Sequence, residues 1–143
     1  MARKQKGKTR ERFAGMPHRL MRADKYINLS AFSKALLFEL AFQYNGKNNG
    51  DLTLSESIIG KRGFAKSTVS REMKKLIEQG FIVVTRQGWK QRGKPTLLAI
   101  TWYGIDDHPQ GIDYDENIRV DPRPLGWWKD GQEPPNKGRK KPN

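Results

Sequence analysis

The sequence predicts an α+β fold in which several helices precede a β-hairpin. Two features indicate this class. Apolar residues recur every three or four positions in separate segments between residues 30 and 80, as on the buried side of a helix. Beyond them, two runs rich in β-branched and aromatic residues, 81–85 and 96–102, flank a loop with two glycines and a proline. We therefore expect helices and an antiparallel hairpin in one domain.

The first helix is predicted from Ser30 to about Tyr44. Ser30 can cap its amino end through the side-chain oxygen. The apolar residues of this helix fall on one stripe and are Phe32, Ala35, Leu36, Leu40 and Ala41. The run NGKNNG at residues 45–50 ends the helix, because Asn and Gly tolerate positive φ.

A short strand and a second helix are predicted next. Residues 52–54 are long enough only for a short strand. The second helix begins at Ser55, and Leu54 and Ile59 are placed to form a hydrophobic staple across its first turn. We expect this helix to stop near Gly63.

The third helix is predicted to begin between Ala65 and Ser67 and to end at Gly80, a residue type common just after helices. One of its faces is apolar and consists of Val69, Met73, Leu76 and Ile77. The opposite face carries short hydroxyls and cations, which are Ser67, Thr68, Ser70, Arg71, Lys74 and Lys75. This outer face is either solvated or suited to a polyanion.

The charge is strongly positive and unevenly distributed along the chain. Lysine and arginine number 28 against 15 aspartate and glutamate, a net charge of +13. The sequence divides into a basic amino-terminal arm at 1–24, a periodic domain at 25–104, and a tail rich in proline and glycine at 105–143. The tail has an acidic run and a basic end, and we expect arm and tail to be disordered or extended. The excess of positive charge favours nucleic acid or an anionic membrane as partner.

Other classes of function find little support in the sequence. The basic start is followed by no apolar core of a secretory signal, and the apolar segment 31–42 is too short to span a bilayer. The absence of cysteine fits a reducing cytoplasm. His18 and His108 lie far apart, and GKT at 7–9 lacks the first glycine of a phosphate loop. We therefore expect no enzyme, no cofactor, no metal site and no membrane partner.

The segment SESIIGKRGFAKSTVSREMKKLIEQGFIVV (55–84), followed by RQGWKQRGKP (86–95), resembles a winged helix-turn-helix domain. The resemblance covers about residues 26–104 and is similar in style to MarR-like regulators. YNGKNNGDLTLS (44–55), followed by this pair of helices and ending in AITW (99–102), also resembles small winged-helix proteins encoded by phages and plasmids. This likeness implies three helices plus a β-hairpin wing and, as the function, binding of double-stranded DNA.

The resemblance also implies where DNA is bound. The amino end of the third helix enters the major groove, where Arg71 can pair with guanine. The helix residues expected at DNA are Lys66, Ser67, Thr68, Ser70, Arg71 and Lys74. The wing residues expected at DNA are Arg86, Trp89, Lys90, Arg92 and Lys94. Cations of the arm add affinity without reading sequence, and these are Arg3, Lys4, Lys6, Lys8, Arg10 and Arg12.

Each of these assignments has an alternative interpretation. The outer face of the third helix and the charged hairpin can serve solubility alone. Trp89 either stacks on nucleic acid or packs back on its own strands. The basic segments at the two ends can serve RNA instead. The acidic run of the tail either folds back over the basic face or is solvated.

We predict a cytoplasmic, sequence-specific double-stranded DNA-binding protein that regulates transcription in a phage, plasmid or other mobile element. One alternative is a replication initiator or accessory DNA-binding protein, whose tail docks another protein through Trp127 and Trp128. Another is a winged-helix interaction module that binds an acidic host factor. A homodimer would have to use the first helix or the tail.

Overall fold

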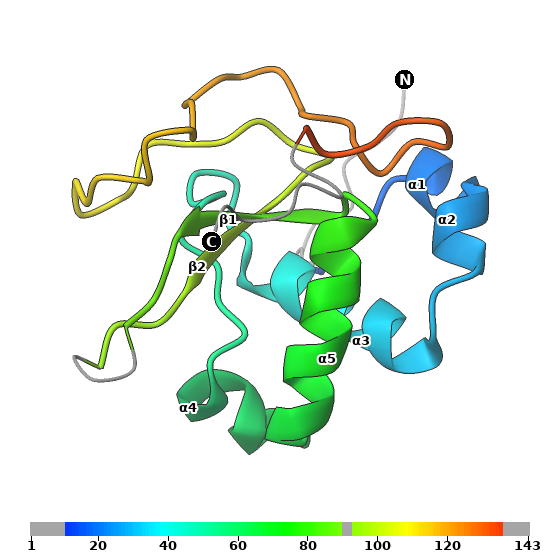
Figure 1. Ribbon diagram of the computed structural model, residues 1–143, viewed down its shortest axis with the longest axis horizontal. Helices are drawn as coiled ribbons and strands as arrows, with labels where there is room; N and C mark the ends of the chain where they lie inside the picture. The colour runs from blue at the N-terminus through cyan, green and yellow to red at the C-terminus, as the bar shows by residue number, and fades with distance from the viewer. Residues whose placement is uncertain (1–10, 90–92, 136–143) are drawn as a thin grey trace, which may run out of the picture.

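The computed structural model describes residues 11–89 and 93–135, in which helices pack against a small antiparallel sheet (Figure 1). The helical elements are α1 (His18–Arg22), α2 (Asp24–Ile27), α3 (Ala31–Gln43), α4 (Glu56–Ile59), the 3-10 turn η1 (Gly60–Arg62) and α5 (Lys66–Glu78). The strands are β1 (Ile82–Arg86) and β2 (Leu97–Ile100). The α+β class is confirmed, but the predicted number of three helices is wrong. The described residues hold five α-helices, because two short ones precede the first predicted helix.

The two long helices, α3 and α5, lie where the periodicity predicts them. The Ser30 Oγ accepts a hydrogen bond from the Ser33 amide at 3.0 Å, so Ser30 caps α3 as predicted. Gly80 follows the end of α5 with a φ of 84°, the left-handed conformation that favours glycine. A β-carbon at this position would lie 2.5 Å from the Trp127 carbonyl oxygen, so glycine is needed for space as well.

The second predicted helix is divided into two short pieces. Its hydrogen bonding changes from α-helical in α4 to 3-10 in η1 at Gly60, a residue of low helix propensity. Gly63 follows with a φ of 89° and turns the chain toward α5. Leu54 and Ile59, which the sequence pairs as a staple, are both buried in the core.

The sheet consists of the hairpin and one additional bridge. β1 and β2 are antiparallel, with Val84 opposite Leu98 and a bulge directly after Val84. The short strand predicted at 52–54 is reduced to a bridge in which Leu52 and Leu98 exchange two backbone hydrogen bonds of 3.1 and 2.7 Å. β2 therefore lies between Leu52 and β1, and the segment before α4 is attached to the hairpin.

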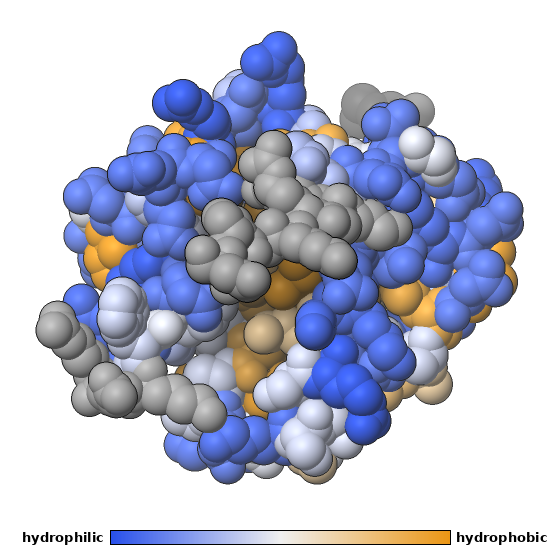
Figure 2. Space-filling view, viewed as in Figure 1, coloured by the Kyte–Doolittle hydropathy of each residue, from blue (hydrophilic) through white to orange (hydrophobic). Residues whose placement is uncertain are grey.

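The hydrophobic core joins the long helices, the sheet and both flanking segments. Its largest fully buried side chains are Leu20, Leu36, Leu37, Leu40, Leu52, Ile59, Leu76, Phe81, Ile82, Leu98 and Ile100. Most of the face shown in Figure 2 is hydrophilic, and apolar surface there is confined to hollows and edges. Burial of these side chains is the dominant favourable term in the stability of the fold.

Part of the predicted basic arm is folded. Leu20 of α1 is fully buried, and Met16 and Ala23 join it in the core. The prediction of a disordered or extended arm is therefore wrong for this part, whereas residues 1–10 lie outside the described residues. The composition misleads because the few apolar residues of this segment bury their surface against the distant core rather than against one another.

The tail is irregular and extended, as predicted, but it is packed on the domain rather than solvated (Figure 1). Ile105 and Trp128 are each 4% exposed, and Trp128 belongs to the core. The Asp115 amide donates to the Thr85 carbonyl at 2.7 Å, which attaches the acidic run to β1. The basic end at 136–143 lies outside the described residues.

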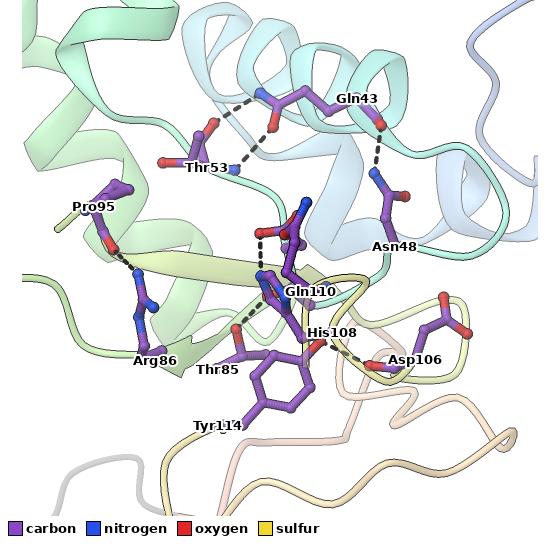
Figure 3. A network of polar contacts seen from close by, with 12 residues as sticks. Gln43, Asn48, Thr53, Thr85, Arg86, Pro95, Asp106, His108, Gln110 and Tyr114 are labelled. Carbon is purple, nitrogen blue, oxygen red and sulfur yellow. Dashed lines mark hydrogen bonds and ion pairs between the residues drawn. The ribbon is translucent and has the colours of Figure 1, made fainter. Parts of the chain in front are cut away.

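A polar network holds the first part of the tail in place (Figure 3). His108 is buried; its Nε2 lies 2.7 Å from the Asp51 carboxylate, and its Nδ1 accepts a hydrogen bond from the Gln110 amide. The Tyr114 hydroxyl donates to the Asp106 carbonyl at 2.8 Å, and burial raises the pKa of Tyr114 to about 12. These contacts give His108 a structural role that its sequence position does not reveal.

The two flanking segments meet at the carboxyl end of α5. The Lys25 ammonium donates to the carbonyls of Gln79 and Trp127 at 3.2 and 2.9 Å, a favourable place for a cation beside a helix. The Asp130 carboxylate accepts from the amides of Asp24 and Lys25 at 2.9 and 3.0 Å and caps α2. These amides hold the pKa of Asp130 below its ordinary value.

Candidate nucleic-acid interface

α5 separates a buried side from an exposed, basic side, as its periodicity predicts. Val69 and Leu76 are buried against the core. The exposed side chains on the outward side are Lys66, Ser67, Ser70, Arg71, Lys74 and Lys75, with Thr68 half-buried beside them. The six residues that the sequence assigns to DNA on this helix therefore all lie on one accessible face or at its edge.

Three cations of this face are available to an anionic partner, whereas Lys75 is paired with Glu72. Arg71 and Lys74 are exposed, and neither forms a hydrogen bond or ion pair with another residue in the described part of the chain. Lys66 lies 3.3 Å from Glu56, but both side chains are more than half exposed. Exposed pairs of this kind contribute little energy, so a phosphate can replace Glu56.

The amino end of α5 has free backbone donors. Ala65 is the N-cap residue and its side chain forms no cap hydrogen bond, so Ser67 lies inside the first turn and is not the N-cap. The amides of this turn carry the partial positive charge of the helix amino end. Together with Lys66 and Arg71 they make this end of α5 a favourable place for an anion.

A groove separates the amino-terminal half of α5 from the hairpin. Its volume is about 650 Å³, and Leu54, Ile59, Val69 and Met73 contribute apolar surface to its lining. Polar side chains also line it, and these include Ser55, Ser57, Ser70, Lys66 and Lys94. A hollow with apolar surface beside α5 is visible near the centre of Figure 2. The helix and the hairpin therefore flank one concave surface.

Only some of the predicted contact residues of the hairpin are exposed in the described part of the chain. Trp89 is 61% exposed and exchanges two backbone hydrogen bonds with Lys94 near the tip, so packing on its own strands covers only a minor part of its surface. Lys94 is exposed at the groove. Arg86 is half-buried and donates to the Pro95 carbonyl at 3.3 Å, so it links β1 to the segment before β2. Lys90 and Arg92 lie outside the described residues.

The arm contributes one described cation from the predicted set. Arg12 is exposed and lies beside a hollow that Tyr44 also lines. The other five, Arg3, Lys4, Lys6, Lys8 and Arg10, lie outside the described residues.

Glu72 is a buried acid on α5 that the sequence reasoning does not identify. Its side chain is 6% exposed; Oε1 accepts from the Ser30 hydroxyl at 2.6 Å and Oε2 lies 3.1 Å from the Lys75 ammonium. The hydrogen bond from Ser30, followed by the ion pair with Lys75, lowers the pKa of Glu72. The spacing of three and four residues from Val69 and Leu76 places Glu72 in the buried stripe, a signal that could have found it.

We expect Glu72→Gln to destabilise the protein by about 1–3 kcal/mol at pH 7, because a charged acceptor loses its negative charge beside Lys75. The folded pKa of Glu72 lies below its ordinary value of 4.5, so its stabilisation is present above that value and fades as the pH falls through the folded pKa. Urea denaturation of both proteins from pH 7 to pH 3 should show the difference shrinking. The exposed Glu78→Gln is the control, and a difference for Glu72→Gln that stays constant with pH would contradict the assignment.

Comparison with known proteins assigns no class: no family model, no curated protein and no solved structure matches the chain. Within residues 11–89 and 93–135, no helix is both long and apolar enough to cross a bilayer. The same residues contain no cluster of three or more acidic or histidine side chains that could hold a metal.

Proposed function

We propose that this protein binds double-stranded DNA in a sequence-specific manner as a winged helix-turn-helix protein and regulates transcription in a phage, plasmid or other mobile element. The observation that carries the proposal is the exposed basic face of α5, whose uncapped amino end lies beside the hairpin across one groove. A helix presented in this way fits the major groove, and an adjacent hairpin reaches the flanking phosphates.

The order of the elements supports a helix-turn-helix with a wing. α4 and η1 lead through Gly63 into α5, and β1 and β2 follow directly. The bridge between Leu52 and Leu98 attaches the start of this unit to the hairpin. This bridge ties the pair of helices to the hairpin. In the proposed complex, the spacing between α5 in the DNA major groove and the hairpin at the DNA phosphates is therefore set by the fold.

We assign different contacts with DNA to several exposed residues of α5 and the hairpin. Arg71 donates two hydrogen bonds to the O6 and N7 atoms of a guanine. Ser67 and Ser70 are short, so the helix backbone can approach the groove closely. Lys74 and Lys94 bind phosphates and contribute affinity without base preference.

The position of the tail favours an α5 face that the acidic run does not block. None of the described residues of the tail lines the groove beside α5. The carboxylates of Asp106 and Asp115 accept hydrogen bonds from the amides of Asn49 and Gln87, each at 2.9 Å. The acidic run is therefore engaged at the sheet and its loops, where it does not cover the exposed side of α5.

The burial of Trp128 bears on the alternative of a replication initiator. That alternative uses Trp127 and Trp128 as an exposed docking peptide, but Trp128 is 4% exposed inside the core and Trp127 is half-buried. A pull-down that depends on Trp127 while the fold stays intact would favour this alternative. A module for an acidic host factor would instead bind duplex DNA no better than its net charge dictates.

Selection of duplexes from a random-sequence pool at about 0.15 M salt tests the proposal. We expect one enriched motif, which single strands and structured RNA do not compete away. Binding without a motif, with affinity that collapses as salt rises, would contradict base reading and favour a purely charge-driven binder.

Deletion of residues 1–10 should reduce the salt dependence of DNA binding and leave the selected motif unchanged. The segment carries five cations, and each phosphate contact it makes adds about 0.9 to the slope of log K against log salt. The deletion stops before α1, because Leu20 is part of the core. DNA titrations at salt concentrations from about 50 to about 200 mM measure the slope for both proteins. A changed motif would show that this segment reads bases.

A further inference from the structure

Two asparagines in the loop after α3 each precede a glycine. The pairs are Asn45–Gly46 and Asn49–Gly50, and the sequence holds no other Asn–Gly pair. In such a pair the backbone nitrogen of the glycine can attack the side-chain carbonyl carbon of the asparagine, because glycine has no β-carbon that hinders the approach. The two pairs lie in opposite environments, so we expect them to differ in this reaction.

Asn45 is arranged for the attack. Asn45 and Gly46 are both exposed, and Gly46 has a φ of 94° with open space where a β-carbon would lie. The side-chain nitrogen of Asn45, which is the leaving group, forms no hydrogen bond with any residue in the described part of the chain, and neither does the Gly46 amide. The leaving group and the attacking nitrogen are therefore both unrestrained.

A backbone donor lies at the oxygen where charge develops. Attack on the side-chain carbonyl carbon moves negative charge onto the Asn45 Oδ1. This atom accepts a hydrogen bond from the Lys47 amide at 2.8 Å. A donor at about 2.7–3.1 Å from such an oxygen stabilises the tetrahedral intermediate of acyl transfer. The loop thus supplies part of the stabilisation that the reaction needs.

Asn49 is held in the opposite way. Its side chain is fully buried. The Asn49 Nδ2 donates to three backbone carbonyls, which are those of Ile100, Tyr103 and Gly104, and its Oδ1 accepts from the Ile100 amide at 2.8 Å. Gly50 is buried as well. Attack by the Gly50 amide would require the Asn49 side chain to rotate and to break hydrogen bonds that no water replaces.

We propose that Asn45 is a site of spontaneous deamidation in the folded protein and that the fold protects Asn49. The Gly46 amide nitrogen loses its proton and bonds to the side-chain carbonyl carbon of Asn45. The bond from that carbon to Nδ2 breaks, and ammonia leaves with the proton. Water then adds to either carbonyl carbon of the resulting succinimide ring and opens it to aspartate or isoaspartate. The reaction needs no co-reactant besides water, and the inference is independent of the proposed DNA binding.

The modification changes the surface at the end of α3. The product carries an additional carboxylate at a hollow of about 520 Å³ that Arg12 and Tyr44 also line. Isoaspartate, in addition, lengthens the backbone by one methylene group directly after Tyr44, whose ring stacks on Tyr103 with the ring centres 5.0 Å apart. Deamidation therefore lowers the positive charge around Arg12 and alters the connection between α3 and the start of the tail.

Peptide mapping by mass spectrometry tests the inference on the full chain, incubated in its folded state at mildly alkaline pH. Trypsin cleaves after Lys47, so the two sites fall in separate peptides, 35–47 and 48–61. We expect the conversion of amide to carboxylate at Asn45 to be about 100-fold faster than at Asn49, because the buried hydrogen bonds of Asn49 must break first. Equal rates at the two sites in the folded protein, or a faster reaction at Asn49, would overturn the inference.

Denaturation and one substitution relate the rates to the structure. In concentrated guanidinium chloride the hydrogen bonds of Asn49 are lost, so both sites should react at similar rates. A difference that persists after unfolding would contradict protection by the fold. Asn45→Gln should leave peptide 35–47 unmodified, because glutamine has to close a larger and less favourable ring. Conversion in this variant at the wild-type rate would place the modification at another residue and overturn the assignment. Circular dichroism of the variant verifies that it is folded.

Discussion

Replacement of Trp128 by alanine is expected to lower the free energy of unfolding by about 3–5 kcal/mol. The indole is 4% exposed and packs in the hydrophobic core, with the Arg19 guanidinium 5.8 Å from its ring centre. Its removal leaves a cavity that the surrounding core fills only in part. The loss approaches the whole stability of a small domain, so the variant should unfold at moderate urea concentration.

Urea denaturation followed by far-ultraviolet circular dichroism measures this effect without relying on tryptophan fluorescence. Trp89→Ala is the matched control, because Trp89 is 61% exposed at the hairpin and its loss should change stability by less than about 1 kcal/mol. Truncation of residues 105–143 should be at least as harmful as Trp128→Ala. A stable, folded truncation would show that residues 1–104 fold without the tail.

Arg71→Ala is expected to weaken binding to the selected DNA motif by about 1–3 kcal/mol, a factor of roughly 5 to 150. Binding to unrelated duplexes should fall much less, because only the specific complex loses hydrogen bonds to a base. Electrophoretic or fluorescence titrations with matched and scrambled duplexes give both values. The side chain is exposed and forms no ion pair with a described residue, so the fold should be unaffected.

Two control variants separate sequence-specific contact with bases from non-specific electrostatic binding to DNA. Arg119→Ala removes an equally charged, exposed residue from the tail. It should change neither the affinity for the selected motif nor the affinity for scrambled duplexes appreciably. Lys74→Ala should weaken binding to all duplexes to a similar extent, as expected of a phosphate contact. Equal losses of specific and non-specific binding for Arg71→Ala would remove Arg71 from the base-reading role.

Sequence patterns predict the central part of this fold well, because there the signals are local and strong. α3 and α5 have clear apolar stripes, and Ser30 and Gly80 mark a start and an end with residue types that suit those positions. The outward face of α5 follows from the same periodicity. Its use in binding DNA is an expectation that the arrangement of α5 and the hairpin supports.

The flanking segments could not be predicted from local patterns. α1 and α2 have five and four residues, too short for a periodic signal, and the tail has no regular structure. Their folded structure depends on contacts with residues far along the chain. Lys25 donates a hydrogen bond to the Trp127 carbonyl, and the Trp128 side chain is buried in the core. Basic and proline-rich composition alone indicates disorder, because it carries no information on such distant partners. For the same reason the structural role of His108 is invisible in the sequence.

The meeting of Lys25, Asp130 and the end of α5 also bears on how the protein is made. During synthesis α5 leaves the ribosome about 50 residues before Trp128, so the core stays open until the segment with Trp128 has emerged. A chain that terminates early lacks Trp128 and the cap from Asp130, and quality-control proteases should degrade it. Incomplete products that carry the basic α5 but lack Trp128 would then be removed.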